Sequence, residues 1–281
     1  MPQSASQAIA AAAHEAAYPD GRAGRFLTAA AVTALCRELG IPPRQVEIEA
    51  LGLGICPLRY ARNLRAFSMA EQARLLASTA AMVGLGGLGG GLLECLARSG
   101  VGTIRAADGD VFEETNLNRQ LLSDCASLGA PKAALAAARA AAVNPSVDFT
   151  AQARFLDAPG MAALLAGADV AVDALGGLTD RPALAAAARD RGIPLVTGAV
   201  AGYTVIVATV APGAASPVEL LAGGGGTAAE EVLGCPAPAV VAAASLMAAE
   251  VVRLLAGRAP ALAGKALVAD LEAMRFDTVT F

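Results

Sequence analysis

The sequence contains no tryptophan, a single histidine and three tyrosines in 281 residues. The only histidine, His14, lies in an N-terminal region that is expected to be mobile, so neither a histidine-based metal cluster nor a Ser–His–Asp catalytic triad is expected. Because aromatic residues make up only 4% of the chain, the core must be built from alanine, valine, leucine and isoleucine. Such side chains suit the close packing of helices on a sheet.

No two cysteines form a Cys-x-x-Cys pair. The five cysteines are Cys36, Cys56, Cys95, Cys125 and Cys235. Their odd number and irregular spacing argue against a disulfide framework and favour a reducing cytoplasm. Cys235 comes directly before an expected helix. It is therefore either a thiol activated by the helix N-terminus or a small buried apolar residue, and the high burial of free cysteine favours the second interpretation.

Charge of either sign is sparse, with a formal net charge of −4 and no basic stripe. We therefore expect no nucleic-acid partner. The apolar residues 9–13 lack a preceding basic region and are followed by His14 and Glu15, which is not typical of a signal peptide. The most apolar long segment, residues 237–255, carries Glu250 and Arg253, so we expect no membrane partner.

Two parts of the chain differ in their pattern. Residues 1–56 are predicted to form a helical N-terminal extension, with Thr28 capping a helix over 29–39 and Pro42-Pro43 beginning one over 44–51. Residues 57–281 are predicted to form one large domain, and its first helix is expected over 69–77.

From residue 80 onward, short apolar runs alternate with helical segments. The expected strands cover 80–84, 103–107, 147–153, 170–173, 194–199 and 205–210. The expected helices cover 88–98, 131–142, 158–165, 180–191 and 236–256, and a loop rich in glycine is expected over 212–234. This alternation predicts an α/β fold with a doubly wound, mostly parallel, Rossmann-like sheet. Two C-terminal strands, 266–270 and 275–281, are expected to add to it in antiparallel fashion.

A glycine-rich turn lies between the first expected strand and the next helix. It contains Gly84, Gly86, Gly87 and Gly89. Glycine permits a tight turn and lets backbone N–H groups approach a phosphate at a helix N-terminus. Asp108, at the end of the second expected strand, can accept hydrogen bonds from ribose hydroxyls. Together these features predict a nucleotide site, with a dinucleotide as the default ligand.

The segment after Asp108 narrows the choice of nucleotide. Asn116 and Arg119 follow it closely, and Lys132 begins the next expected helix. A nicotinamide dehydrogenase does not need these groups, whereas a nucleotidyltransferase needs cations to stabilise the charge on departing pyrophosphate. For either cation taken alone, a solvated surface charge is the favoured interpretation.

These motifs together resemble the ThiF/MoeB/HesA family of E1-like adenylyltransferases, which act on ubiquitin-like sulfur carriers. The resemblance is carried by the glycine turn, by the Asn-Leu-Asn-Arg-Gln run at 116–120 and by the Gly-Ala-Pro-Lys run at 129–132, and it covers roughly residues 57–260. It implies that the chain uses ATP to adenylylate the C-terminal glycine carboxylate of a carrier ending in Gly-Gly, in thiamine- or molybdopterin-type sulfur transfer.

The resemblance also implies roles for individual residues. Asp108 is expected to hold the ribose, and Arg119 and Lys132 are expected to act catalytically on the phosphates. Arg62, in the run Arg59-Tyr-Ala-Arg-Asn63, is expected to reach the ATP of the neighbouring subunit in a homodimer. The expected ATP-binding residues are Gly84, Gly86, Gly87, Gly89, Asp108, Asp110, Asn116, Arg119, Lys132 and Asp173.

The chain departs from the family pattern at its metal. The family's Asp-x-x-Asp-Asn run helps to bind Mg²⁺ through its second aspartate, but here Asp173 is followed by Gly176 and Gly177. Mg²⁺ is still expected, because phosphoryl chemistry needs charge compensation, and Asp110, Asp173 or Asp180 are the candidate replacements. No residue is assigned as a protein metal ligand. Zinc is not expected, because the family's paired Cys-x-x-Cys motifs are missing.

Three alternatives stay open. The loss of the acid at position 176 also fits a non-catalytic pseudoenzyme that binds a nucleotide or a carrier. The glycine turn alone fits an NAD-dependent oxidoreductase. A different E1-like substrate, such as a peptide C-terminus or a tRNA base, is the third alternative. Neither the identity of the carrier nor the role of the N-terminal extension follows from the sequence.

Overall fold

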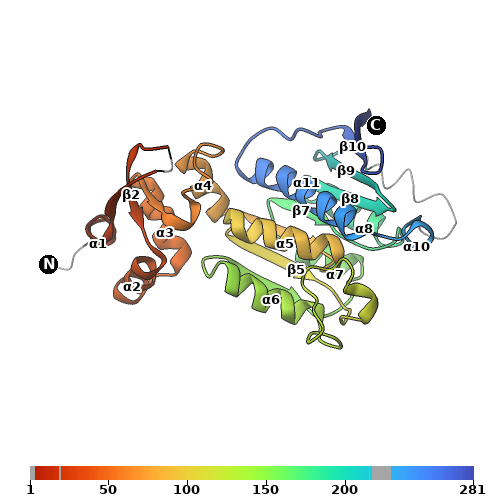
Figure 1. Ribbon diagram of the computed structural model, residues 1–281, viewed down its shortest axis with the longest axis horizontal. Helices are drawn as coiled ribbons and strands as arrows, with labels where there is room; N and C mark the ends of the chain where they lie inside the picture. The colour runs from red at the N-terminus through yellow and green to blue at the C-terminus, as the bar shows by residue number, and fades with distance from the viewer. Residues whose placement is uncertain (1–3, 19, 215, 217–228) are drawn as a thin grey trace.

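The structure is a computed structural model that describes residues 4–18, 20–214, 216 and 229–281. A small N-terminal unit lies at one end of an elongated molecule, and a large α/β domain forms the rest (Figure 1). The four glycines at 223–226, part of the expected loop, lie outside the described residues.

The N-terminal unit contains strands as well as helices. Its elements are α1 (Ala5–Ala12), β1 (His14–Ala17), β2 (Ala23–Leu27), α2 (Ala29–Leu39), α3 (Pro43–Gly52) and β3 (Ile55–Pro57). The strands form a sheet in the order β1-β2-β3. The two helices predicted in this extension are present, but the prediction missed the sheet. The strands are only three to five residues long and β1 is exposed throughout, so they lack the alternation that identifies a strand. This small sheet ends at Pro57. The domain boundary near residue 56 stays a prediction.

The helix ends in this region follow their predicted caps. The Thr28 hydroxyl accepts a hydrogen bond from the Ala31 N–H, and Gly40 ends α2 in a left-handed conformation. A short 3₁₀ helix, η1 (Leu58–Tyr60), and helix α4 (Met69–Ala77) lead into the large domain. Arg44 of α3 attaches the unit to that domain by donating to the Gly102 carbonyl and the Thr103 hydroxyl.

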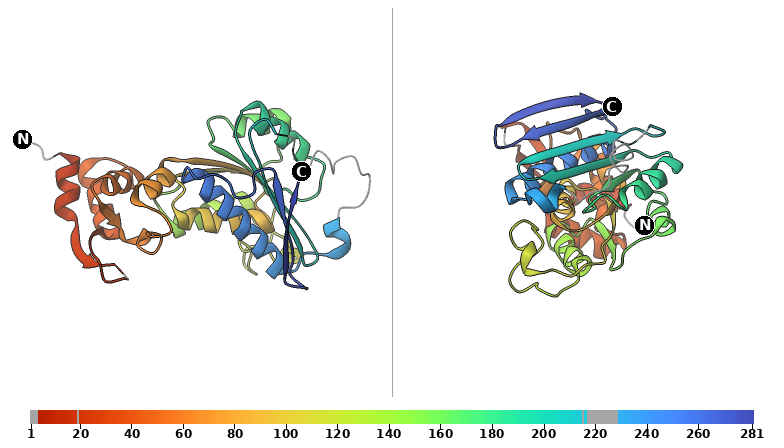
Figure 2. Two further views of the ribbon diagram at one scale, coloured as in Figure 1. Left: turned by 90° about the horizontal axis from the view of Figure 1, so that it is seen from above. Right: turned by 90° about the vertical axis from the view of Figure 1, so that its right-hand side faces the viewer.

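The large domain is built on an eight-stranded sheet in the order β11-β10-β9-β8-β7-β4-β5-β6. The strands are β4 (Thr79–Val83), β5 (Thr103–Ala107), β6 (Asp148–Gln152), β7 (Val170–Asp173), β8 (Leu195–Ala201), β9 (Thr204–Val210), β10 (Lys265–Asp270) and β11 (Arg275–Thr280). Five neighbouring strands of the sheet, β6, β5, β4, β7 and β8, are parallel to one another. Strands β9, β10 and β11 each pair with their neighbours in antiparallel fashion. Figure 2 shows β10 and β11 at one edge of the sheet. The predicted doubly wound sheet with antiparallel C-terminal strands is confirmed.

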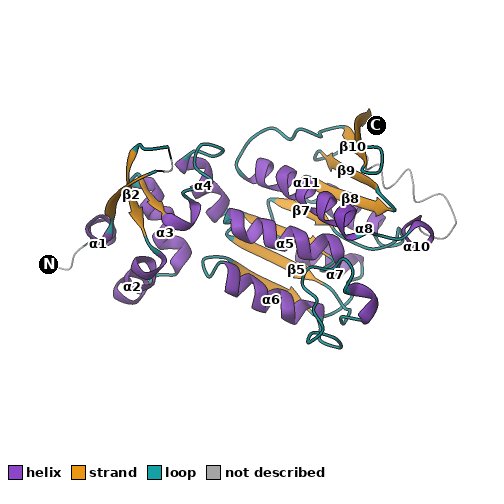
Figure 3. Cartoon of the chain, viewed as in Figure 1, coloured by secondary structure: helices purple, strands orange, loops and turns teal. Residues whose placement is uncertain are grey.

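Helices cover both faces of this sheet (Figure 3). They are α5 (Gly87–Ser99), α6 (Lys132–Val143), α7 (Ala158–Leu164), α8 (Arg181–Asp190), α10 (Ala229–Leu233) and α11 (Ala237–Leu255), with a 3₁₀ turn η2 (Glu114–Asn116). Strand β4 shows how the layers form: Ala80 and Met82 face the core under α5, α6 and α11, whereas Ala81 and Val83 face the core under α7 and α8. Helix α10 lies within the segment predicted as a loop, so that prediction is wrong there.

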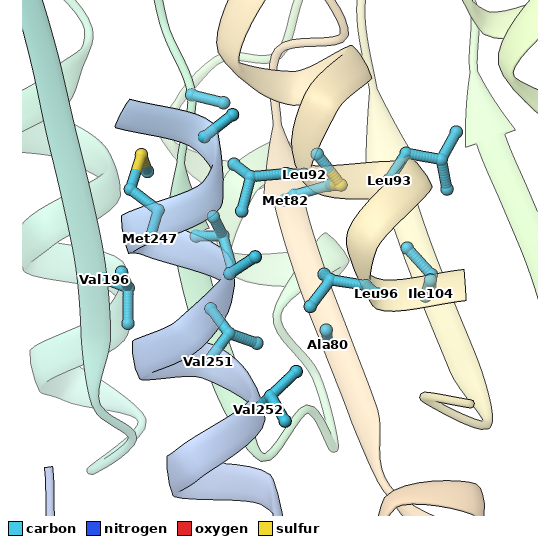
Figure 4. Close-up of a cluster of buried hydrophobic side chains, with 14 of the residues drawn as sticks. Ala80, Met82, Leu92, Leu93, Leu96, Ile104, Val196, Met247, Val251 and Val252 are labelled. Atoms are coloured by element: carbon cyan, nitrogen blue, oxygen red, sulfur yellow. The ribbon is translucent and has the colours of Figure 1, made fainter. Parts of the chain in front are cut away.

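Helix α11 is the one helix in the described part of the chain that is long and apolar enough to cross a membrane. Figure 4 shows it instead between β8 and α5, with Met247, Val251 and Val252 among the buried side chains. Its one buried acid, Glu250, accepts hydrogen bonds from the Thr209 hydroxyl and the Leu262 N–H. The apolar surface of α11 is therefore explained by core packing.

We predict that Gly89→Ala destabilises the domain, whereas Gly52→Ala does not. A Cβ atom on Gly89 would lie 2.0 Å from the carbonyl oxygen of Gly84, a backbone atom that cannot move without disturbing the turn. We expect the free energy of unfolding to fall by about 2–3 kcal/mol. At Gly52, also helical, a Cβ would meet no atom within 4 Å. Urea unfolding followed by circular dichroism measures both variants, and equal stability of the two would contradict this account of the turn.

Candidate functional site

The site lies where three parallel strands end side by side. Val83 of β4 is in register with Ala107 of β5 on one side and with Asp173 of β7 on the other. The helices that follow β4 and β5, α5 and α6, cover one face of the sheet, whereas α7 and α8, which flank β7 in the chain, cover the other face. The carboxyl ends of β4 and β7 therefore form a topological switch point, where open α/β sheets bind their ligands.

The glycine turn fits this position closely. Gly84 has a φ of +101°, and a Cβ there would lie 2.3 Å from the carbonyl oxygen of Ala174. Helix α5 then begins at Gly87, and no side chain caps its N-terminus. The free N–H groups and the partial positive charge of this terminus suit an anionic ligand.

Asp108 fixes the turn from the neighbouring strand. Its Oδ2 accepts a 2.6 Å hydrogen bond from the Leu85 N–H, and its Oδ1 accepts a 2.8 Å bond from the Asp110 N–H. A carboxylate offers about four lone-pair positions, so both oxygens keep acceptor capacity for ribose hydroxyls.

A cavity of about 420 Å³ opens over the turn. Most of the sequence-predicted ATP-binding residues line it together: Gly84, Gly86, Gly87, Asp108, Asp110, Asn116, Arg119 and Lys132. Gly89 packs against the Gly84 carbonyl within the turn and is not one of the lining residues. The volume falls in the range typical of small-molecule sites.

Two of the cationic residues that line the cavity were predicted from the sequence, Lys132 and Arg119. Lys132 is 6% exposed, and its Nζ lies 3.0 Å from Oδ2 of Asp110. The guanidinium of Arg119 is oriented by its own segment, because it donates to the Thr115 carbonyl and to Asn118 Oδ1. Asn116 is buried, and its Oδ1 accepts from the Glu113 N–H, which shapes the turn that carries Arg119.

Asp173 lies behind the cavity wall and is not one of its lining residues. Its carboxylate is 1% exposed and forms a 3.0 Å ion pair with Arg181 and a 2.7 Å hydrogen bond with the Thr197 hydroxyl. Arg181 in turn donates to the carbonyls of Leu175 and Gly177, so the buried pair shapes the loop after β7. In this structure Asp173 acts on the loop rather than facing the cavity.

Arg62 is exposed and lies outside the residues that line the cavity of its own subunit. The neighbouring Arg59 pairs instead with the buried carboxylate of Glu47 at 3.3 Å. Burial raises the pKa of Glu47, and the charge of Arg59 opposes that rise. The two arginines of this segment are thus placed differently, one inward and one toward solvent.

Several polar residues that line the cavity were not among the predicted site residues. Gln120 is 6% exposed, and its Oε1 has no hydrogen-bond partner. Arg181 and Glu230 also line the cavity. The position of Gln120 directly after Arg119 was a signal in the sequence, whereas Glu230 comes from a distant segment.

Cys235 also lines the cavity, with its Sγ 3.7 Å from the Val200 carbonyl oxygen. Burial raises the pKa of this thiol, the charge of Glu230 raises it further, and the charge of Arg119 lowers it. The net direction is upward, which is opposite to the shift that activates a cysteine.

Comparisons with known proteins show the family to which the chain is related. The ThiF family matches residues 60–281. A SAMP-activating enzyme E1 from Haloferax volcanii is 35% identical over 231 residues, which are 79% of this chain and 84% of that protein. The molybdopterin-synthase adenylyltransferase of Escherichia coli is 32% identical over 225 residues, which are 78% of this chain and 90% of that protein.

Solved structures show the same fold. PaaA superposes with a TM-score of 0.67 at 24% identity, covering 79% of this chain and 82% of PaaA. Escherichia coli MccB, in a structure determined with ATP, superposes with a TM-score of 0.66 at 19% identity, covering 89% of this chain and 82% of MccB.

We predict that Cys235 reacts slowly with iodoacetamide at pH 7.5, because its raised pKa leaves little thiolate and its thiol is half-buried. The exposed Cys125 serves as the internal reference and should be alkylated at least about tenfold faster. Timed alkylation followed by peptide mass spectrometry measures both rates. Faster labelling at Cys235 would identify an activated thiol and contradict this prediction.

Proposed function

The chain belongs to the ThiF family, and from that premise we propose that it is an E1-like adenylyltransferase of a ubiquitin-like sulfur carrier. It uses ATP to adenylylate the C-terminal glycine carboxylate of a carrier ending in Gly-Gly. The observation that carries the proposal is the cavity itself, where the uncapped N-terminus of α5, Asp108, Arg119 and Lys132 converge. The names of two relatives, of which this chain spans 84% and 90%, support the reaction and the class of partner.

The cavity suits ATP in one orientation. The phosphates lie over Gly86 and Gly87, where backbone N–H groups of α5 donate, and the ribose hydroxyls reach Asp108. Arg119 and Lys132 then neutralise phosphate charge at the same wall. The buried amide of Gln120 supplies a further polar contact.

The reaction needs little more than alignment. An oxygen of the carrier's carboxylate attacks the α-phosphorus, the bond from that phosphorus to the bridging oxygen breaks, and pyrophosphate leaves with the electron pair. The nucleophile is already anionic, so no side chain has to remove a proton. Arg119 and Lys132 stabilise the charge that builds on the leaving group. The carrier acyl-adenylate that results is the activated form for a later sulfur transfer.

The cavity also fits Mg²⁺, because the acidic residues Asp110, Asp180 and Glu230 are among those that line it. When bound, the ion offsets the charge of the phosphates.

We further propose a homodimer in which Arg62 enters the cavity of the partner subunit. Its exposure, and its position outside the cavity of its own subunit, support this role. We place the enzyme in the cytoplasm, where its five free cysteines stay reduced.

Carrier-dependent ATP–pyrophosphate exchange tests the function. We expect exchange with a Gly-Gly-terminated carrier, and we expect Arg119→Ala to lower its rate about 100-fold, because a cation at the leaving group is lost. Arg98→Ala on the solvent side of α5 is the matched control and should keep the wild-type rate. Nucleotide binding without exchange would point to a pseudoenzyme, and exchange driven by a peptide C-terminus would move the substrate outside the sulfur carriers.

A mixing experiment tests the shared site. Alone, Arg62→Ala and Arg119→Ala should each have a rate about 100-fold below that of the wild type, because every site then lacks one cation. Mixed subunits that exchange partners form heterodimers with one intact site, and we expect about a quarter of the wild-type activity to return. If mixing restores nothing although mass spectrometry of differently tagged subunits shows heterodimers, Arg62 does not act across the interface.

A further inference from the structure

A carboxylate from a distant segment stands at the cavity beside Gly176. Helix α10, in the connection between β9 and α11, carries Glu230, whose Oε1 accepts a 2.7 Å hydrogen bond from the Gly177 N–H. A Cβ atom built on Gly176 would lie 3.6 Å from that same oxygen. The loop after β7 has no acid of its own at this point, and Glu230 places one next to it.

Most other acids near the turn are already engaged. Asp108 accepts two backbone hydrogen bonds, Asp110 pairs with Lys132, and Asp173 is buried against Arg181. Asp180 lines the cavity but is exposed at the beginning of α8. Glu230 is half-buried and oriented by one N–H donor, and its remaining lone pairs can accept a further ligand.

Glu230 lines the same cavity as Arg119 and Lys132. The buried Oε1 of Gln120, which lines that cavity too, has no hydrogen-bond partner among the described residues. The charges of Glu230 and Arg119 shift the pKa of the Cys235 thiol in opposite directions, which agrees with their placement around one space. Glu230 therefore faces the cavity in which the phosphates are expected.

We propose that Glu230 is the carboxylate that holds the divalent cation carried by the nucleotide, in place of an acid on the loop after β7. This inference rests on the proposed ATP site. In this proposal the cation is held jointly by Glu230 and by the phosphates of the nucleotide. Mg²⁺ is commonly held in this way, by one or two carboxylates together with phosphate oxygens and water.

The test measures how strongly a divalent cation and a nucleotide favour each other's binding. The probes are Mn²⁺ and α,β-methylene ATP, with nucleotide affinity from calorimetry in Mn²⁺ or EDTA and bound Mn²⁺ from electron paramagnetic resonance. We expect Mn²⁺ to strengthen nucleotide binding in the wild type, and Glu230→Gln to reduce that enhancement about tenfold. Glutamine keeps an oxygen that accepts from the Gly177 N–H and removes only the charge. In EDTA, Glu230→Gln should bind the nucleotide at least as tightly as the wild type, because a negative charge near the phosphates is gone.

Two further variants sharpen the result. Glu231→Gln, exposed on the same helix, is the matched control and should keep the wild-type enhancement. Gly176→Asp in the Glu230→Gln background should restore it, because the space admits a Cβ in ordinary contact and Gly176 has no left-handed φ.

The outcomes separate this inference from the function on which it rests. Unchanged enhancement in Glu230→Gln, or its loss in Asp180→Asn instead, overturns the role of Glu230 and leaves the ATP site intact. A wild-type protein that binds no nucleotide under either condition overturns both.

Discussion

The glycine turn after β4 is packed so closely that two of its residues leave no room for a side-chain atom. Cβ atoms on Gly84 and Gly89 would lie 2.3 and 2.0 Å from backbone oxygens, those of Ala174 and Gly84. This close approach brings the N-terminus of α5 to the ends of three parallel strands. It therefore creates the cavity and directs free N–H groups into it, and the charged residues of the site are arranged around that opening.

The charges around the opening divide into two groups. Arg119 and Lys132 face the cavity, whereas the Asp173–Arg181 pair lies in or behind its wall and shapes the loop after β7. Glu230 reaches the same loop from the connection between β9 and α11. Under the proposed function, phosphate binding, leaving-group stabilisation and cation binding belong to different segments, and the bound nucleotide contacts all of them.

Much of this could be predicted from sequence, because the signals were local. Thr28 and Gly40 bounded α2, the apolar runs marked the large sheet, and the glycine turn and Lys132 each belonged to a short motif. Strands β1 to β3 could not, since they are short and largely lack alternation. Asp173 was expected at the ligand because sequence does not distinguish a buried structural acid from a binding one. Glu230 was missed because 53 residues separate it from Gly177, and only the fold brings them together.

The central claim is that ATP lies over the glycine turn with its phosphates between the α5 N-terminus and the two cations. A crystal structure with α,β-methylene ATP and a divalent cation tests it most directly. The account predicts phosphate oxygens within hydrogen-bond distance of the Gly86 and Gly87 N–H groups, Arg119 and Lys132, and ribose hydroxyls on Asp108. A nucleotide bound elsewhere, or turned so that its phosphates point away from these groups, would contradict it.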